Sequence, residues 1–595
     1  MRHLKTAPFL TLTLTLGLGV AGTVWAQEAA DAVAPEAASV LGEIVPEALK
    51  SAQQAKDSGV PFKAENWMVA AANPLAVEVG ADVLRNGGTA ADAMVAVQAV
   101  LGLVEPQSSG LGGGAFLVWY DAQSGAVTTL DGRETAPLAA SPRLFQDAEG
   151  QPLKFFDAVV GGLSVGVPGT PKLMQEAHRR WGRSEWPDLL APAIGLAEAG
   201  FTVSPRMADS VARDAERLAT HPTTAAYFLP GGVPVAAGDT LQNAAYAHSL
   251  SQIAQHGTAP FYTGDIAADI VAAVRGAALP GVLRDVDLAL YQVKERPATC
   301  LEYKGHDVCG MGPPSSGGLT VGQILGLVEP FDLAAMGADD PQAWRLIGDA
   351  SRLAFADRGR YMADSDFVPV PVQGLLADDY LNARSELLKR DDALSDVAPG
   401  TPEFDHALIW ADDDAIELPS TSHISIVDQY GNALSMTTTI ENGFGSRVMV
   451  GGFLLNNELT DFSFRSHRDG VPVANRVEPG KRPRSSMAPT IVLKDGQPVL
   501  VVGSPGGSRI IGYVAKTIIA HLDWGMDVQQ AVSMPHRVNR FGAYDVETDE
   551  LVAPLEALGF EVKQRGLNSG LHAISVGDHL SGGADPRREG VAFGE

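Results

Sequence analysis

Apolar residues dominate positions 74–104, and a polar break, Asn86-Gly87-Gly88, divides the stretch in two. Thr89, followed three residues later by Asp92, is typical of a helix start, because each side chain can bond the backbone N–H of the other. We therefore predict two consecutive helices within residues 74–104. Alanine-rich helical patterns recur over residues 170–275.

Beyond residue 422 the pattern changes to short alternating runs that are typical of strands. Ile424 and Ile426 alternate with Ser425, residues 429–431 form a turn, and a second run covers residues 433–440. The sequence therefore predicts an antiparallel hairpin centred on the turn.

A second hairpin is predicted further along the chain. Residues 490–494 and 499–502 are its strands, and Asp495-Gly496 is its turn. The glycine-rich segment 503–508 and an apolar helix over residues 509–524 follow it. The second half of the chain is thus predicted to be an antiparallel sheet with helices beside it.

Composition excludes several classes of protein. The chain has 595 residues, and its net charge of −27 argues against binding to nucleic acid or to an anionic membrane surface. The 64 glycines and 38 prolines are dispersed, which excludes collagen-like and low-complexity chains. There is no CxxC, HExxH or Cys/His cluster, so we predict no metal site and no cofactor.

The N-terminus has the features of a secretory signal peptide. Arg2, His3 and Lys5 precede an apolar stretch over residues 9–20, and Val24-Trp25-Ala26 resembles a cleavage site. The stretch is too short and threonine-rich for a comfortable membrane span, although a retained anchor is the alternative. We predict a signal peptide over residues 1–26 and a periplasmic or secreted protein without a membrane anchor.

Export makes the two cysteines informative. The segment Cys300–Cys309 is centred on Lys304-Gly305, a plausible two-residue turn, so that Tyr303 faces His306 and the cysteines face each other. At such a non-hydrogen-bonded pair the Cα separation is about 4.5 Å, which a disulfide can bridge. We predict a structural disulfide; two unpaired buried thiols are the alternative.

Residues 391–420 form the sharpest compositional break. They contain nine Asp or Glu and no Lys or Arg, with prolines at 399, 402 and 419. We predict a solvated, poorly packed linker.

A threonine follows this linker at the start of the first hairpin. Hairpin symmetry places Thr421 opposite Thr439. Cleavage before Thr421 would create a nucleophile and a base in one residue, because a freed α-amine has a pKa near 8 and can take the hydroxyl proton. Gly506 and Gly507, between a strand end and a helix start, are a candidate oxyanion hole. A structural threonine and a glycine turn needed for packing are the alternatives.

Two familiar motifs are rejected on their context. Residues 110–115 fit a dinucleotide-binding pattern, but a strand follows them where a helix is needed. Residues 162–166 fit a nucleophile elbow around Ser164, but Pro168-Gly169 interrupts the helix that should follow.

The chain resembles the γ-glutamyltranspeptidase family along nearly its whole length. The matching stretches occur in family order, which makes the resemblance specific. They are Asn73-Pro-Leu-Ala, Asn86-Gly-Gly-Thr-Ala-Ala-Asp92, Ser109-Gly-Leu-Gly-Gly-Gly114, Gly132-Arg-Glu-Thr-Ala-Pro137, Val165-Gly-Val-Pro-Gly169, Pro313-Pro-Ser-Ser-Gly-Gly318, Ala356-Asp-Arg358, Thr421-Ser-His423, Leu455-Asn-Asn457, Arg484-Ser-Ser-Met487 and Gly503-Ser-Pro-Gly-Gly507.

The resemblance implies an α+β fold, the αββα four-layer sandwich of N-terminal-nucleophile (Ntn) hydrolases, with two antiparallel sheets between helical layers. It implies self-cleavage between Ser420 and Thr421 into a large subunit (27–420) and a small subunit (421–595), which form a heterodimer. The implied activity is that of a γ-glutamyltransferase or glutathione hydrolase. The γ-glutamyl group of glutathione or a similar compound would pass through Thr421 to water, an amino acid or a dipeptide.

The resemblance also implies roles for individual residues. Thr421 is the nucleophile, Thr439 orients it, and Gly506 and Gly507 hold the oxyanion. An arginine and two serines bind the substrate α-carboxylate, and three acids face its α-amine. These residues are Arg133, Ser485 and Ser486 for the carboxylate, and Glu441, Glu458 and Asp461 for the amine.

The chain departs from some relatives at this site. Some have Asn at the position of Glu441 and Gln at that of Glu458, so the site here is more acidic. Residues 462–480, which correspond to a flap over the pocket in some members, are short and contain no tyrosine.

Two other functions compete with this one. A cephalosporin (glutaryl) acylase would use the same nucleophile on a substrate without an α-amine, and a binding protein would keep the fold without catalysis. The intact Thr421, Thr439, Gly506 and Gly507 argue against the binding protein. Three buried carboxylates without a cation would be costly, which argues against the acylase. The preference for water or an acceptor stays open.

Overall fold

Two antiparallel sheets of seven strands each form the centre of the molecule. The computed structural model describes residues 45–406, 409–413, 415, 417 and 420–595. The first sheet has the order β23 (Val591–Gly594), β2 (Met68–Ala71), β10 (Ser422–Val427), β11 (Ala433–Thr439), β3 (Gly114–Asp121), β4 (Ala126–Gly132), β7 (Lys294–Arg296). The second has the order β1 (Phe62–Ala64), β22 (Leu580–Ala584), β21 (His572–Val576), β17 (Gln497–Gly503), β16 (Thr490–Lys494), β9 (His306–Gly310), β8 (Thr299–Tyr303).

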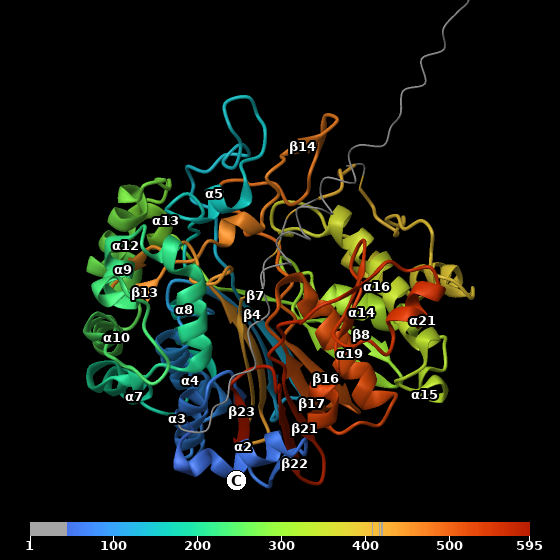
Figure 1. Ribbon diagram of the computed structural model, residues 1–595, viewed down its shortest axis with the longest axis horizontal. Coiled ribbons are helices and arrows are strands. Elements are labelled where there is room, and N and C mark those ends of the chain that lie inside the picture. Colours follow the sequence, from blue (N-terminus) through green and yellow to red (C-terminus); the bar gives the residue numbers. More distant parts are fainter. Residues whose placement is uncertain (1–44, 407–408, 414, 416, 418–419) are drawn as a thin grey trace, which may run out of the picture.

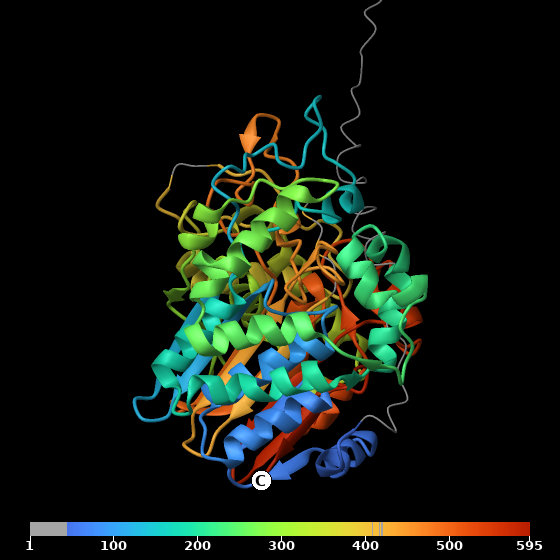
Figure 2. The ribbon, with the colours of Figure 1, turned by 90° about the vertical axis from the view of Figure 1, so that its left-hand side faces the viewer.

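Helices cover the outer face of each sheet, so the predicted αββα sandwich is confirmed (Figure 1). Figure 2 shows the helices that lie over the first sheet. They include α3 (Pro74–Arg85), α4 (Ala90–Val104), α6 (Thr170–Trp181), α7 (Trp186–Ala199) and α10 (Ala244–His256). The second sheet is covered by α14 (Gly317–Val328), α16 (Pro341–Tyr361), α19 (Ile510–Leu522) and α20 (Val528–Ser533), among others.

Alternation along the strands builds separate apolar layers. In β2, Val69 and Ala71 belong to the core beneath the helices, whereas Met68 and Ala70 belong to the core between the sheets. Successive strand residues point to opposite faces, so a strand that is apolar throughout supplies both layers. This explains why β2 is buried along its whole length. In β10, which is also buried throughout, Ile424 and Ile426 belong to the core beneath the helices, whereas His423 and Ser425 on the opposite face are hydrogen-bonded to each other.

The local sequence signals are confirmed where they rest on short-range geometry. Asn86 ends α3, and the predicted bonds between Thr89 and Asp92 both form at the start of α4. The apolar helix predicted over 509–524 is α19, preceded by the 3₁₀ turn η5 (Gly507–Arg509). Helices also occupy much of 170–275, namely α8 (Pro205–Leu218), α9 (Pro222–Phe228), α11 (Ala259–Thr263) and α12 (Asp265–Gly276) besides those above.

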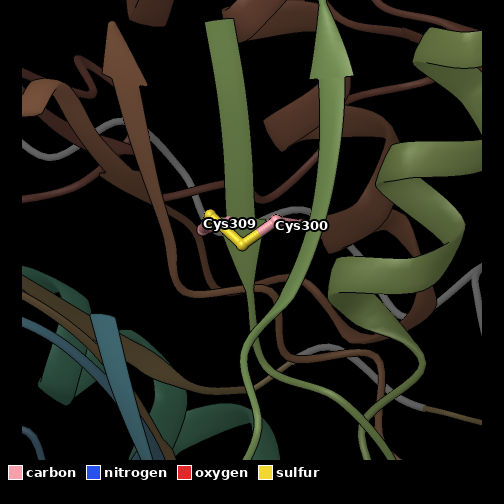
Figure 3. Close-up of a disulfide and its surroundings, with 2 residues drawn as sticks. All are labelled: Cys300 and Cys309. Atoms are coloured by element: carbon pink, nitrogen blue, oxygen red, sulfur yellow. A yellow bond between two sulfur atoms is a disulfide. The ribbon is translucent and has the colours of Figure 1, made fainter. Parts of the chain in front are cut away.

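The predicted disulfide is present in the β8–β9 hairpin (Figure 3). Cys300 pairs with Cys309, and Tyr303 pairs with His306. Lys304 and Gly305 both have positive φ, as a two-residue hairpin turn with the right twist requires. The cysteine Cα atoms are 4.1 Å apart.

The prediction of a poorly packed linker over 391–420 is wrong for several of its described residues. Trp410 is buried against Ala363, Val368 and Ala474. Glu417 is only 5% exposed. A charged residue is rarely buried without a partner of opposite charge, and here Arg358 and Arg484 of the folded body lie within 4 Å of Glu417.

Residues 1–26, the predicted signal peptide, lie outside the described part of the chain. No helix within the described part combines the length and the apolar character needed to cross a membrane.

We expect the double variant Cys300→Ser, Cys309→Ser to lose about 2–3 kcal/mol of unfolding free energy, because the bridge closes a short loop in the unfolded chain. The thermal unfolding midpoint measures this. Reductant should lower the midpoint of the unmodified protein and leave that of the variant unchanged. Free alkylation of both thiols in the unreduced, denatured protein would contradict the bridge.

Candidate active site

The ladder between β10 and β11 sets the position of Thr421. Ser422 pairs with Thr438, so the next residues outward, Thr421 and Thr439, lie opposite each other. Their hydroxyl oxygens are 3.3 Å apart. This is the relation that hairpin symmetry predicts.

The carbonyl of Ser420 lies between the two threonine hydroxyls in the uncut chain. Thr439 Oγ1 donates to it over 2.9 Å, and the Thr421 hydroxyl donates to it as well. Arg588 Nη1 donates to the carbonyl of Thr421 over 2.8 Å, which fixes the backbone on the C-terminal side of Thr421. Two donors polarise the Ser420 carbonyl, and the hydroxyl that could attack it is already in contact.

The glycine segment after β17 has a backbone that other residues would not adopt easily. Gly506 and Gly507 have φ values of 140° and 59°. A Cβ atom on Gly506 would lie 2.6 Å from the ring of Tyr513. The segment leads into η5 and α19, whose N-terminal N–H groups favour negative charge.

A small cavity of about 20 Å³ joins these groups. It is large enough for about one water molecule. Nine of the ten residues to which the resemblance gives a catalytic or binding role line it, and Gly506 adjoins them through Gly507. The full lining is Arg133, Glu417, Ser420, Thr421, Thr439, Glu441, Glu458, Asp461, Ser485, Ser486, Met487, Gly507 and Ile510.

Arg133 and two acids form a buried ionic cluster on one wall of the cavity. Arg133 follows β4, and both acids are on the 3₁₀ turn η4 (Glu458–Asp461). Arg133 Nη1 donates to Glu458, and Arg133 Nη2 donates to Asp461 Oδ2 over 2.5 Å. The remaining bonds of the guanidinium go to the backbone carbonyls of Pro483 and Arg484.

Burial dominates the proton affinity of this cluster. It raises the pKa of Glu458 and of Asp461 above their ordinary values, although Arg133 acts in the opposite direction. Glu134, which the sequence analysis did not select, lies 3.9 Å from Arg133 and is fully buried. Burial raises the pKa of Glu134 to about 8. One guanidinium therefore faces three carboxyl groups that resist being ionised together.

The other predicted residues are held by backbone contacts and short bonds. Glu441 has a φ of 73° and accepts a bond from Asn457. The Ser485 carbonyl accepts from the N–H of Ser316 over 2.8 Å. The Ser486 hydroxyl accepts a bond from Arg358 over 2.7 Å and donates to Glu417.

Sequence reasoning also missed Glu417, which lines the cavity, and Arg358, which bonds Glu417 and Ser486 behind it. Glu417 lies within the acidic linker, where nothing distinguishes it from eight other acids. Arg358 belongs to Ala356-Asp-Arg358, a stretch that resembles the family but to which the resemblance gives no role. The resemblance of this stretch is the sequence signal that could have indicated Arg358.

The two motifs rejected on sequence context, and residues 462–480, do not line the cavity. Residues 110–115 lead into β3, and Ser164 is buried with its hydroxyl on the Val159 carbonyl. Residues 462–480 include the short hairpin β14 (His467–Arg468) and β15 (Val471–Pro472), at the top of Figure 1. Among the described residues no three His, Cys, Asp or Glu side chains are grouped so that they could hold a metal ion.

Replacing Arg133 by Met should remove the cation and leave the two acids buried. Breaking a buried pair costs about 3–5 kcal/mol of stability. Burial already raises the pKa of both acids, and they lose their cation in the variant, so the folded variant holds protons that the unfolded chain has released. Holding these protons costs more free energy at pH 8 than at pH 5, so the loss of stability should be larger at pH 8. Thermal unfolding midpoints at both values measure it.

The matched control is Arg179→Met, because Arg179 is 66% exposed on a helix surface. It should change the midpoint little at either pH. An equal loss at pH 8 and pH 5 for Arg133→Met would contradict the electrostatic description of the cluster.

Comparisons with known proteins agree on one family. The profile described as Gamma-glutamyltranspeptidase matches residues 76–595. A glutathione hydrolase proenzyme of Bacillus subtilis (strain 168) is 38% identical over 550 residues, covering 89% of this chain and 92% of that protein. Acylase ACY 1 proenzyme of Pseudomonas sp. (strain SE83) is 32% identical over 544 residues, covering 89% and 94%.

A solved structure is similar over the same extent. The crystal structure of cephalosporin acylase from Bacillus halodurans has a TM-score of 0.79 and 26% identity, covering 90% of this chain and 97% of that one. The family profile and the first relative each span most of the sequence. The chain therefore belongs to the γ-glutamyltranspeptidase family.

Proposed function

We propose that this protein is a self-processing γ-glutamyltransferase or glutathione hydrolase. It cleaves its own chain before Thr421 and then uses Thr421 to break γ-glutamyl amide bonds. The observation that carries the proposal is a single cavity lined both by Thr421 and by the Arg133–Glu458–Asp461 cluster. A nucleophile thus lies beside groups of both charge signs.

Processing begins with attack of the Thr421 hydroxyl oxygen on the carbonyl carbon of Ser420. A C–O bond forms, the C–N bond to Thr421 breaks, and the hydroxyl proton ends on the released amine. Water then hydrolyses the ester, leaving a carboxylate on Ser420 and a free α-amine on Thr421. The contacts of Thr439 with the Ser420 carbonyl support this step, because donors on a carbonyl stabilise the charge that develops during attack.

The same residue then serves the substrate. The freed amine of Thr421 accepts the hydroxyl proton, and the oxygen attacks the γ-glutamyl carbonyl. N–H groups of Gly506 and Gly507 stabilise the oxyanion. The leaving amine departs with the proton, and an acyl-enzyme ester remains. Water or the amine of an acceptor breaks that ester and releases the product.

The donor is recognised by its charged end. An α-amino acid carries an ammonium and a carboxylate on one carbon, and the cavity wall presents acids beside arginine. Arg133 forms forked bonds to a carboxylate, with Ser485 and Ser486 adding hydroxyl donors. The ammonium takes the place of the guanidinium near Asp461, Glu458 and Glu441. A zwitterion of this kind inserts into the existing ion pairs without leaving a buried charge alone.

A glutaryl acylase is the second candidate, and acylases among the relatives favour it. A glutaryl group has a carboxylate but no ammonium to offset the three acids. Glu441, Glu458 and Asp461 are each less than 7% exposed. The cost of burying them without a substrate cation favours the γ-glutamyl donor.

The physiological setting follows from the same scheme. Residues 1–26 direct export to the periplasm or the exterior and are removed. Residues 27–420 and 421–595 remain together as a heterodimer after the cut. Glutathione or another γ-glutamyl compound is the donor, and water, an amino acid or a dipeptide is the acceptor.

Thr421→Ala should remain one uncut chain, because no hydroxyl can attack the Ser420 carbonyl. Thr421→Ser keeps a hydroxyl and should still be cut. Denaturing electrophoresis and N-terminal sequencing of the smaller fragment measure the result. Thr401→Ala, an exposed threonine in the same linker, is the matched control and should process normally. A small fragment that begins anywhere but at Thr421 would refute the proposed site.

Asp461→Asn keeps the shape of the side chain and removes one charge. Losing a charged hydrogen bond costs about 1.5–3 kcal/mol, so kcat/KM for a γ-glutamyl anilide should fall roughly ten- to a hundredfold. A glutaryl anilide has no ammonium, and its turnover should be unchanged or improved. The ratio of the two rates is the measurement.

The exposed Asp578→Asn serves as the control for this substitution and should leave the ratio unchanged. If both substrates slow equally while Asp461→Asn stays folded and cut, Asp461 does not bind the amine.

A further inference from the structure

A carboxylate from the linker lies in the cavity of the uncut chain. Glu417 is four residues before Thr421 and lines the cavity together with it. Its oxygens contact Arg358 and the Ser486 hydroxyl, and Arg484 lies 3.6 Å away. This places a chain carboxylate on one of the serines proposed to bind the substrate carboxylate.

The arginines behind Glu417 require an anion. Arg358, on α16, is fully enclosed and bonds the hydroxyls of Ser316 and Ser486 over 2.7 Å each. Burial and the nearby Arg484 lower the pKa of Arg358, and Glu417 acts in the opposite direction. A buried guanidinium next to another is stable only with a negative partner.

The two arginines differ in how they are neutralised. Arg484 also forms an ion pair with Asp413 over 3.0 Å, and Asn475 bonds the same carboxylate. Among the residues that the structure describes, the acid at hydrogen-bonding distance from Arg358 is Glu417. Arg358 is therefore the cation that depends on the acidic linker residue closest to the proposed cut.

The two arginines also affect the pKa of Glu417. Burial acts to raise the pKa of Glu417, yet Arg358, Arg484 and Ser486 together lower it below its ordinary value. The side chain is thus a carboxylate that the pocket stabilises, as a carboxylate-binding site would.

We propose that Arg358 extends the carboxylate subsite of Arg133, Ser485 and Ser486, and that Glu417 occupies its Arg358–Ser486 part in the uncut chain until the α-carboxylate of the donor replaces it after processing. The inference rests on the proposed function, because only the cut frees the end of the segment that carries Glu417. Before the cut, Glu417 is attached to the folded body on both sides, and a tethered ligand outcompetes a free one through its effective concentration. After the cut it is attached on one side, and the substrate can replace it.

The test uses the uncut Thr421→Ala chain and two probes. L-glutamine has an α-carboxylate as its only carboxylate, and L-glutaminamide has none. Removing the carboxylate by Glu417→Ala in the Thr421→Ala background should tighten L-glutamine binding by at least about tenfold, the effect of one charged hydrogen bond. L-glutaminamide binding should not change. Calorimetric titration measures both.

Controls keep the outcome decisive. Glu403→Ala removes an exposed acid from the same linker and should not change L-glutamine binding. Glu417→Gln keeps the volume and should give a smaller gain of the same sign, and it decides the question if Glu417→Ala fails to fold. No gain for L-glutamine, or an equal gain for L-glutaminamide, overturns the inference.

The proposed function is tested by a separate experiment. Release of aniline from a γ-glutamyl anilide by the processed, unmodified protein tests that function without involving Glu417. An active enzyme with no gain in binding for the Glu417 variants overturns the subsite alone. An inactive processed enzyme overturns the function, whatever the binding measurements give.

Discussion

The ladder between β10 and β11, near the middle of the first sheet, is the constraint on which the site depends. A strand paired on both sides cannot shift by one residue without turning its apolar face away from the core. The register that buries Ile424 and Ile426 therefore also fixes Thr421 opposite Thr439. Reactive geometry at the strand end is thus maintained by packing far from the chemistry.

The second organising feature is the burial of charge. Arg133 and Arg358 are enclosed, and each is matched by carboxylates on other segments. Such pairs contribute little net stability, because desolvation offsets their attraction. In the proposed function, their value lies in a preformed set of charges that a zwitterionic ligand can enter by exchange. Glu417 and the donor carboxylate are the proposed alternative ligands of the same arginines.

Sequence predicted what depends on short-range geometry. The hairpin turns, the start of α4 and the pairing of Cys300 with Cys309 followed from spacing alone, whereas the sandwich of two sheets between helical layers came only from the resemblance to a family. Glu134 and Glu417 escaped prediction because their partners are set by tertiary packing. Glu417 contacts Arg358, 59 positions earlier. From composition alone an acidic residue is expected to be solvated, because the sequence does not show that it folds against a buried arginine.

The strand order of the first sheet has a consequence for the two pieces of a cut chain. β2, β3, β4 and β7 precede Thr421, whereas β23, β10 and β11 follow it, and the order interleaves them. In the second sheet, four adjacent strands that follow Thr421 lie between β1 on one side and β9 and β8 on the other, all of which precede it. Neither piece contains a complete sheet, so separating them would expose strand edges and both apolar cores. Dissociation and unfolding would then be a single event, and one polypeptide cut in two would keep the cooperativity of an uncut domain.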